Sequence, residues 1–398
     1  MRLIFFVEGF TDIRFVSGLA QVCDLTMVVP ARSYRESGLE SRVSEAKVPI
    51  RVEKIGGGRI AFQLRSFLWL WKHAREFDGI LAQEMLRGAL NSTVIGKLRG
   101  VPVATYLGIA PVDYFRCRRE RKQIGFFKAL VGEWVIRLLL KINGRLSDIC
   151  LGMGPYLREV GAKYCSRTAV GLYYGVDTHL FRPATAQEIR ELRQRLRLPT
   201  DKFLVVLSSR ISHEKDPETV LKACSLARNR GVDLVLLNLG GGFRDFLALA
   251  KKMGIANDDQ WVLGRAAVNP LRDLADYFRA ADALALASLA EGAAFSTLEA
   301  LACGTPVVAT DIGGMHVQLQ GYASLVPRQD FQQMAKAIEC VAKQPKPARD
   351  QAMRGREYVV REWNHQKAFS DLIHTMISIS NLPKEETLPT AHKQSRQG

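Results

Sequence analysis

Residues 283–314 read ALALASLAEGAAFSTLEALACGTPVVATDIGG, and this stretch decides the fold. The small apolar residues of 283–290 predict a strand that ends in a turn at Glu291 and the glycine after it. Helix formers follow over 298–303 and stop at a Gly-Thr-Pro sequence, which commonly ends a helix. The apolar residues 307–309 then predict another strand. The order strand, helix, strand is typical of an α/β domain with a parallel sheet.

Two carboxylates, Glu291 in the turn and Glu299 in the first turn of the predicted helix, are eight residues apart and are expected on one side of one cleft. The helix is predicted to begin near Ser296, so its first N–H groups and the positive end of its dipole point at the turn, which suits a phosphate. Carboxylates accept hydrogen bonds from sugar hydroxyls. Phosphate and hydroxyl groups together indicate a nucleotide sugar as the ligand.

An alternative interpretation of the same residues is purely structural. Ser296, Thr297, Leu298 and Glu299 fit a capping box, in which the serine caps the helix and the glutamate returns to the backbone N–H of the serine.

The complete pattern resembles the retaining nucleotide-sugar glycosyltransferases of the GT-B fold, specifically glycosyltransferase family 4. It consists of Glu-Gly, seven residues between the two glutamates, and then EALACGTPVVAT. The resemblance implies an α/β protein with two Rossmann-like parallel-sheet domains that face each other across a cleft. It also implies that Glu299 holds the nucleotide ribose, Glu291 the sugar hydroxyls and the amides after Gly292 the phosphates. The donor-binding residues expected here are Gly292, Ala293, Ala294, Phe295, Ser296, Thr297, Leu298 and Glu299.

Composition indicates a globular chain large enough for two domains. It has 398 residues, of which 47% are apolar, and a formal net charge of +16. Residues 1–182 carry 28 basic and 16 acidic side chains, a net charge of +12, so the first half holds most of the basic character. The seven cysteines show no metal-ligand spacing, which favours a reducing, cytoplasmic setting. The opening apolar run is too short for a secretory signal and predicts the first strand.

The first half alternates predicted strands and helices, which indicates a parallel sheet covered on both faces. Ligands bind such sheets at the carboxyl ends of the strands, so the turns at Gly9 and Gly108 are candidate walls of the cleft. Residues 56–58, three glycines, are either a third wall or a flexible loop. Residues 30–59 are otherwise expected to form a charge-rich loop.

Residues 116–145, RCRRERKQIGFFKALVGEWVIRLLLKINGR, combine nine basic residues with an apolar body. They predict either a core helix with an exposed basic lead-in or an interfacial element attracted to anionic lipid. Nucleic acid is not an expected partner, because no recognition motif is present. In glycosyltransferases that resemble this chain the first domain holds the acceptor, so a membrane-facing patch would suit a lipid-linked acceptor.

The second strand and helix series follows a connector at 171–183, which resembles the hinge of the family. We therefore predict an acceptor-side domain over 1–182, a nucleotide-sugar-binding domain over 183–360, a helix over 361–381 that crosses back to the first domain, and a disordered tail over 382–398.

Several residues outside the opening stretch match family positions. Arg210 and Lys215 match the pair that clamps the donor diphosphate, and two serines stand where a glycine often precedes the arginine. A guanidinium fork and an ammonium charge suit a leaving pyrophosphate. Gly264 and Arg265 resemble the segment whose backbone reads the nucleobase.

One departure concerns the mechanism. Many family members carry a histidine at the end of the fourth strand of the first domain, whereas the corresponding residues 104–108 read ATYLG and no histidine occurs between His73 and His179. Tyr106 and Asp113 are candidates to occupy the space that this histidine fills in the family.

The sequence therefore predicts a retaining glycosyltransferase that moves a sugar from a nucleoside-diphosphate sugar to a glycan or lipid-linked acceptor. Glu291, Arg210 and Lys215 are the predicted catalytic residues, and Gly9 joins the donor-binding set. We expect no metal and no cofactor, a front-face reaction with the departing phosphate as base, and a cytoplasmic protein that can lie on the inner face of a membrane. Two alternatives are a nucleotide-sugar-binding protein without turnover and a nucleotide-sugar epimerase on the same fold.

Overall fold

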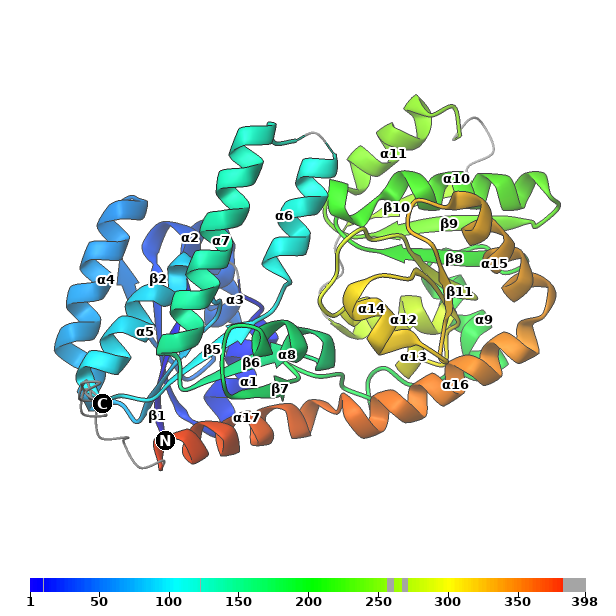
Figure 1. Ribbon diagram of the computed structural model, residues 1–398. Coiled ribbons are helices and arrows are strands. Elements are labelled where there is room, and N and C mark those ends of the chain that lie inside the picture. The colour runs from blue at the N-terminus through cyan, green and yellow to red at the C-terminus, as the bar shows by residue number, and fades with distance from the viewer. Residues whose placement is uncertain (10, 122, 256–260, 267–270, 382–398) are drawn as a thin grey trace, which may run out of the picture.

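A computed structural model describes residues 1–9, 11–121, 123–255, 261–266 and 271–381 of the chain, so the predicted tail lies outside the described residues. The described residues form two parallel sheets that stand next to each other, one of seven strands and one of six (Figure 1). Two separate α/β domains agree with the architecture expected from the sequence. Within the described residues, no helix has the length and apolar character needed to span a bilayer.

The first sheet has the strand order β3-β2-β1-β4-β5-β6-β7. Its strands are β1 (Arg2–Phe6), β2 (Asp24–Pro30), β3 (Arg51–Ile55), β4 (Gly79–Ala82), β5 (Val103–Leu107), β6 (Ile149–Met153) and β7 (Thr168–Gly171). Its helices are α1 (Ile13–Val22), α2 (Ala31–Glu36), α3 (Leu39–Glu45), α4 (Arg59–His73), the short 3-10 helix η1 (Ala74–Glu76), α5 (Arg87–Arg99), α6 (Pro111–Glu120), α7 (Phe126–Leu146) and α8 (Pro155–Ala162).

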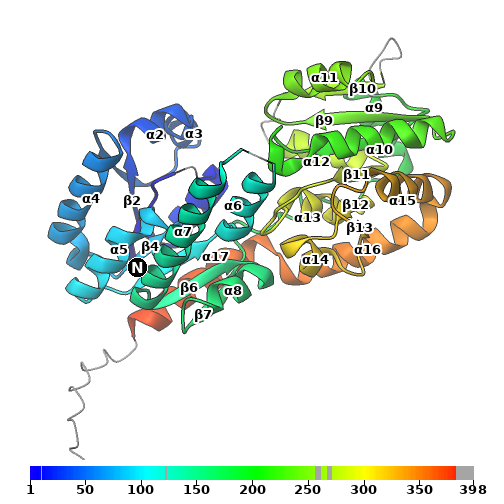
Figure 2. The same cartoon turned by 45° about the horizontal axis from the view of Figure 1, so that its top comes forward.

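The helices of this domain cover both faces of its sheet. Helices α4, α5 and α7 pack next to one another on one face, while α1, α2 and α3 lie on the other (Figure 2). The expected charge-rich loop over 30–59 was wrong, because that segment forms α2, α3 and the edge strand β3. The basic segment 116–145 extends over two helices, since α6 ends at Glu120 and α7 begins at Phe126.

The second sheet has the strand order β10-β9-β8-β11-β12-β13. Its strands are β8 (Phe203–Ser208), β9 (Leu234–Leu239), β10 (Val262–Arg265), β11 (Ala283–Leu286), β12 (Val307–Thr310) and β13 (Ser324–Val326). Its helices are α9 (Ala186–Arg195), the 3-10 helix η2 (His213–Lys215), α10 (Pro217–Asn229), α11 (Phe243–Lys252), α12 (Leu271–Ala280), α13 (Phe295–Ala302), α14 (Gly313–Leu319), α15 (Phe331–Lys343) and α16 (Pro345–Glu362), and α17 (His365–Ser380) ends the described chain.

Each sheet reverses its winding direction at its centre. In the first sheet β1 pairs with both β2 and β4, and in the second β8 pairs with both β9 and β11. The loops that follow the two central strands of each sheet must diverge to opposite faces, which opens a crevice at the carboxyl edge. The loops after β8 and β11 therefore border the crevice of the second sheet, although they are far apart in the sequence.

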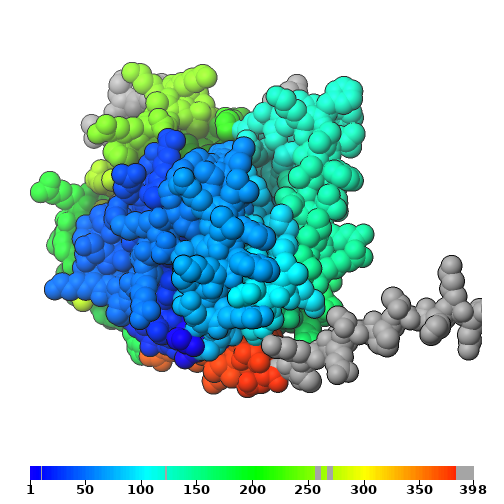
Figure 3. All heavy atoms as spheres, turned by 90° about the vertical axis from the view of Figure 1, so that its left-hand side faces the viewer, coloured from blue at the N-terminus to red at the C-terminus, as the bar shows by residue number. Residues whose placement is uncertain are grey.

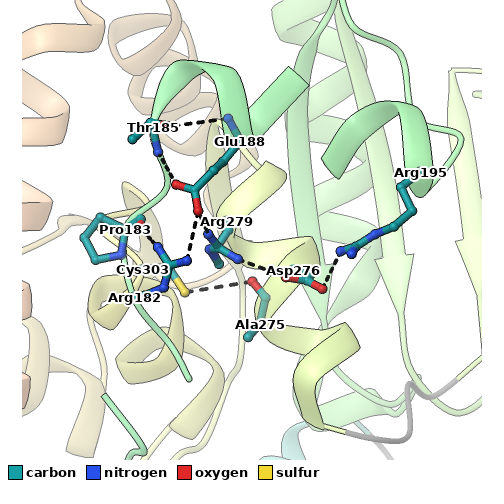
Figure 4. A network of polar contacts seen from close by, with 9 residues as sticks. All are labelled: Arg182, Pro183, Thr185, Glu188, Arg195, Ala275, Asp276, Arg279 and Cys303. Carbon is teal, nitrogen blue, oxygen red and sulfur yellow. Dashed lines mark hydrogen bonds and ion pairs between the residues drawn. The ribbon is translucent and has the colours of Figure 1, made fainter. Parts of the chain in front are cut away.

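A network of charged residues attaches the connector between the domains to the second domain (Figure 4). Glu188 accepts hydrogen bonds from Arg182 at 2.9 Å and from Arg279 at 2.7 Å. Asp276 pairs in turn with Arg279 at 3.1 Å and with Arg195 at 2.5 Å. These contacts join α9 to α12 and fix the point at which the chain enters the second domain.

The end of the described chain returns to the first domain. A helix over 361–381 was expected, and the structure has α17 there, after a break that separates it from α16; at this break Asn364 caps α17 and pairs with Val176 of the connector. Trp363, at the break, is fully buried. Helix α17 then packs on α1, where Phe369 contacts Gly18 so closely that a β-carbon at this glycine would overlap the phenyl ring. Both domains share this helix pair as a common base.

Candidate active site

The crevice of the second sheet brings two of the predicted catalytic residues into contact. Lys215, from η2 after β8, places its Nζ against Oε1 of Glu291, in the turn after β11. The hydroxyl of Ser288 donates to the same carboxylate oxygen at 3.0 Å. Both charged side chains are largely removed from water, with 18% of Lys215 and 5% of Glu291 exposed. A carboxylate and an ammonium group are thus held together at the carboxyl edge.

Arg210 lies in the same loop but extends into solvent. Its side chain is 70% exposed, and its Nη2 donates to Oε1 of Glu214 at 3.1 Å. Burial alone would raise the pKa of Glu214, but hydrogen bonds and the charges of Arg210 and Lys215 outweigh it and hold that pKa below its ordinary value. The guanidinium is therefore a cation next to the buried pair that can turn toward a ligand.

Glu299 has a different environment from Glu291. It is 4% exposed, and its Oε1 accepts a hydrogen bond at 3.0 Å from Nη1 of Arg14, which belongs to α1 of the first domain. The Arg14 guanidinium stacks on the ring of Tyr174 at 3.7 Å and also pairs with Asp12. Burial raises the pKa of Glu299 to about 7, although Arg14 acts in the opposite direction. The two predicted glutamates therefore occupy separate surroundings.

The capping-box alternative is wrong. Helix α13 begins at Phe295, its N-cap is Ala294, and no side chain caps it. Glu299 consequently lies in the second turn, not the first, and its carboxylate goes to Arg14 rather than to Ser296. A tertiary ion pair has replaced the local hydrogen bond that the sequence favours.

The turn between Glu291 and α13 leaves most of its backbone donors available. Among the described residues, the N–H groups of Gly292, Ala293, Phe295 and Ser296 make no hydrogen bond. The N–H of Ala294 donates to Gln318 at 3.3 Å, and the Gln318 amide returns a hydrogen bond to the Ala294 carbonyl. A row of free amides at a helix N-terminus is suited to bind an anion.

The remaining predicted residues of this turn are part of the interior. Thr297 and Leu298 are fully buried, and the Thr297 hydroxyl donates to the carbonyl of Ala294 at 2.7 Å. The ring of Phe295 packs against Tyr174 at 4.4 Å between centroids. These side chains support the turn, and a ligand can reach only their backbone.

Three further predicted residues take no part in the contact between Lys215 and Glu291: Gly264, Arg265 and Gly9. Gly264 and Arg265 end β10 at the edge of the second sheet, where the Arg265 carbonyl accepts a hydrogen bond from Gly240 at 3.3 Å. Gly9 is exposed and lines a separate cavity of about 570 Å³ within the first domain. The structure thus brings Lys215 and Glu291 together, with Arg210 beside them, and places Gly9 elsewhere.

Helix α6 of the first domain reaches the second domain next to this site. Tyr114 packs on Leu289 and Ala290, directly before Glu291. Beyond the end of α6, Arg121 pairs with Asp216, the neighbour of Lys215, at 2.8 Å. Residues from both domains therefore surround the Lys215 and Glu291 pair.

A cavity of about 540 Å³ separates α6 from the second sheet, and Glu291 and Asp113 both line it. The hydroxyl of Tyr156 donates to Oδ2 of Asp113 at 2.5 Å and fixes that carboxylate. The hydroxyl of Tyr106, in contrast, is buried and donates to the carbonyl of Gly171 at 2.8 Å. Of the two candidates for the space of the missing histidine, only Asp113 faces the cavity.

Sequence reasoning missed Arg14 and Tyr114 as neighbours of the site. Arg14 is 285 positions from its partner Glu299, and no local pattern marks such a contact. Tyr114 lies on α6 between Asp113 and the basic segment 116–145, and no local pattern marks its contact with the second domain. Both contacts arise from the way the two domains meet.

Comparison with known proteins finds a family model that matches part of the chain. Residues 188–358 match the model of the glycosyl transferases group 1 family. The chain is 38% identical over 145 residues to a D-inositol 3-phosphate glycosyltransferase of Arthrobacter sp., a match that covers 35% of this chain and 33% of the relative. It is 34% identical over 179 residues to the enzyme of that name from Mycobacterium avium, covering 44% of this chain and 41% of the relative. The chain therefore matches less than half the length of these relatives.

Solved structures extend the likeness to both domains. The Anabaena protein HepE, solved in complex with UDP-glucose, superposes with a TM-score of 0.75 at 16% identity, covering 95% of this chain and 100% of HepE. The glycosyltransferase WaaG, involved in lipopolysaccharide biosynthesis, gives a TM-score of 0.67 at 14% identity, covering 96% of this chain and 100% of WaaG. At such low identities the likeness concerns the fold, and it confirms the predicted architecture. The chain thus has the GT-B fold, and its residues 188–358 resemble the glycosyl transferases group 1 family.

Proposed function

We propose that this protein is a retaining glycosyltransferase of family 4 that moves a sugar from a nucleoside-diphosphate sugar to a glycan or lipid-linked acceptor. The observation that carries the proposal is the contact between Lys215 and Glu291 at the carboxyl edge of the second sheet, with Arg210 beside it. The group 1 family match over the same domain supports it. Uridine nucleotides are the first donors to test, because HepE binds UDP-glucose.

Each group in the site has a role in this proposal. The free amides that follow Gly292 bind the diphosphate, and Glu291 accepts hydrogen bonds from the hydroxyls of the transferred sugar. Glu299 holds the ribose once Arg14 has released it. Arg210 and Lys215 stabilise the negative charge that builds on the diphosphate as it departs, which is the role that a metal ion fills in other sites. The reaction then needs neither metal nor cofactor.

Retention follows from a front-face route. The acceptor hydroxyl approaches the sugar from the side on which the diphosphate leaves, and a departing phosphate oxygen takes the hydroxyl proton. The new glycosidic bond forms as the bond to the diphosphate breaks, so the anomeric configuration is kept. Asp113, held by Tyr156 in the cavity next to Glu291, accepts a hydrogen bond from the incoming acceptor and positions it.

The proposed location is the cytoplasmic face of an anionic membrane. In the basic segment 116–145, helix α7 exposes Phe126, Phe127, Leu130 and Trp134, each by 60% or more of its surface. Aromatic and aliphatic side chains among Lys and Arg are typical of helices that lie in a bilayer interface. The seven cysteines are all free thiols, in keeping with a reducing compartment.

Thermal unfolding of the purified protein with UDP-, GDP- and ADP-sugars tests the donor site. A ligand that binds the folded state raises the midpoint by mass action. We expect one nucleotide to raise it, and both Glu299→Ala and Arg210→Ala to lose the shift. Arg361→Ala, which alters an exposed arginine on α16, is the matched control and should keep it. No shift with any nucleotide sugar in the wild type contradicts the proposal.

Incubation with the donor that binds separates transfer from the two alternatives. A binding protein leaves the donor intact, whereas an epimerase releases a new free sugar without an acceptor. A transferase that lacks its acceptor hydrolyses the donor slowly, and the proton NMR spectrum of the sugar first released should show the anomer of the donor.

A further inference from the structure

The helical layer formed by α4, α5 and α7 carries most of the charge of the first domain. These three helices contain ten basic residues and one acidic residue, whereas α1, α2 and α3 on the other face contain four basic and three acidic residues. The net charges are +9 and +1. The positive potential of the domain is therefore concentrated on one side.

Helix α4 also exposes an apolar stripe on this side, separate from the apolar face of α7. Ile60, Leu64, Leu68 and Trp71 recur every three to four residues and are 44% to 79% exposed, while Phe62 and Leu70 on the opposite side of the helix are buried. Figure 3 faces the left-hand side of Figure 1, and there α4 lies in the middle of the view in mid-blue. Four large apolar side chains that remain at least 44% exposed among the described residues indicate a partner.

The charge around the stripe decides what the partner is. Arg65 and Lys72 lie on α4 itself, Arg75 follows it, and Lys97 and Arg99 lie at the end of α5. The guanidinium of Arg99 stacks on the Trp71 ring at 5.0 Å. Association with the same face of a second copy would bring two strongly positive layers together and is disfavoured. A bilayer that contains anionic lipids offers both the opposite charge and an apolar interior.

A cavity opens at the beginning of this helix. A space of about 570 Å³ at the carboxyl edge of the first sheet is lined by Gly57, by Gly58, the N-cap of α4, and by Arg59, its first residue. Glu8 and Glu84 line it from the loops after β1 and β4. Arg59 is exposed and has no ion-pair partner within the described part of the chain. The cavity therefore offers carboxylates to hydroxyl groups and a free guanidinium to an anion.

We infer that α4 rests on an anionic bilayer together with α7 and that the cavity at its N-terminus receives the polar headgroup of a membrane lipid. Phe62 and Arg59 face the cavity, while Ile60 and Leu64 of the same helix face outward. A lipid whose chains lie along the stripe would place its headgroup at the cavity. The part of this inference that concerns the acceptor rests on the transfer proposed above: the acceptor is a lipid and not a soluble glycan. The membrane contact itself does not depend on the transfer.

Flotation with vesicles tests the contact. The wild type should bind vesicles of phosphatidylcholine mixed with phosphatidylglycerol and bind much less to phosphatidylcholine alone. The double variant Leu64→Glu/Leu68→Glu should lower the bound fraction by at least about tenfold although α7 is intact. Met353→Glu/Val360→Glu, which alters two exposed apolar residues on α16, should bind like the wild type. Thermal midpoints show whether each variant is folded.

Two outcomes would overturn the membrane contact. One is equal flotation of the α4 double variant and the wild type. The other is a wild-type dimer in light scattering that the α4 variant abolishes, because a second copy would then cover the stripe. Neither outcome bears on nucleotide binding, so failure of the donor site would be recognised separately by the thermal shifts with nucleotide sugars.

Short-chain phosphatidylglycerol, kept below its micelle concentration, tests the cavity. It should raise the thermal midpoint of the wild type, and Arg59→Ala should reduce the shift severalfold while Arg361→Ala keeps it. If inorganic phosphate at the same concentration gives the same shift, the ligand is a free anion and the headgroup assignment is wrong. If neither compound shifts the midpoint, the cavity does not bind a headgroup.

Discussion

The two sheets reverse direction in the same way, yet the ion pairs at their two crevices differ. Lys215 and Glu291 in the second domain are 18% and 5% exposed, whereas Arg87 and Glu8 in the first are 52% and 11% exposed. An ion pair that is removed from water gives up hydration that a surface pair keeps. The second crevice thus holds two charges at a cost in stability. Such a cost is expected where the charges serve a ligand.

The largest effect should follow from removing one partner of the buried pair. Lys215→Ala leaves the carboxylate of Glu291 buried without its cation, and loss of one partner in such a pair costs about 3–5 kcal/mol. We expect the free energy of unfolding in urea to fall by that amount and hydrolysis of the donor to become undetectable.

The double variant Lys215→Met/Glu291→Gln separates the two effects. It removes both charges, so most of the lost stability should return while hydrolysis stays absent. If the double variant is as unstable as Lys215→Ala, the cost arises from packing and not from the unpaired carboxylate.

Glu299 makes the stability of the second domain depend on pH. Burial raises its pKa from 4.5 to about 7, so between these values the folded state binds a proton that the unfolded state has released. The corresponding stability is fully present below about pH 4.5 and is lost as the pH rises through about 7. Glu299→Gln, which does not ionise, should lose less stability than the wild type between about pH 5 and pH 8 in urea titrations.

Arg14 provides the matching test, because its guanidinium lowers the pKa of Glu299. Arg14→Ala should therefore shift the pH at which stability declines to a higher value. An unchanged pH profile in both Arg14→Ala and Glu299→Gln would assign the dependence to another group.

The elements that short-range sequence patterns determine were predicted correctly from the sequence. The run from β11 to β12 was predicted because small apolar strands and a glycine stop are local signals, and Glu291 lies in the turn between them. The edge strand β3 was missed, since only Ile55 at its end is buried and it therefore lacks an apolar pattern. The partner of Glu299 was missed because a capping box is a local rule, while Arg14 comes from the other domain. The break at Trp363 depends on contacts with the connector, which no helical periodicity reveals.

A smaller effect should come from the close packing behind the Glu291 turn. The Gly314 N–H donates to the Glu291 carbonyl at 3.1 Å, and a β-carbon at Gly314 would overlap the carbonyl oxygen of Gly292. Gly314→Ala should therefore displace the turn and cost about 1–3 kcal/mol. The urea midpoint and the nucleotide-induced thermal shift should both decrease. Gly125→Ala is the control, because a β-carbon there has no other heavy atom within 4 Å.

The smallest effect should come from the pair in the first crevice. Arg87 donates through Nε to Oε1 of Glu8 at 3.1 Å, but the arginine is half exposed and water can replace it, so Arg87→Ala should cost less than about 1 kcal/mol. Burial already raises the pKa of Glu84, the charge of Glu8 adds to that shift and Arg87 opposes it, so the variant should raise this pKa further. A loss in urea as large as that of Lys215→Ala would mean that the first crevice is as closed to water as the second. A small loss of unfolding free energy that disappears at high salt would instead show that the ion pair of the first crevice is exposed to solvent. A headgroup that arrives from solvent or from a bilayer can then enter this crevice without breaking a buried ion pair.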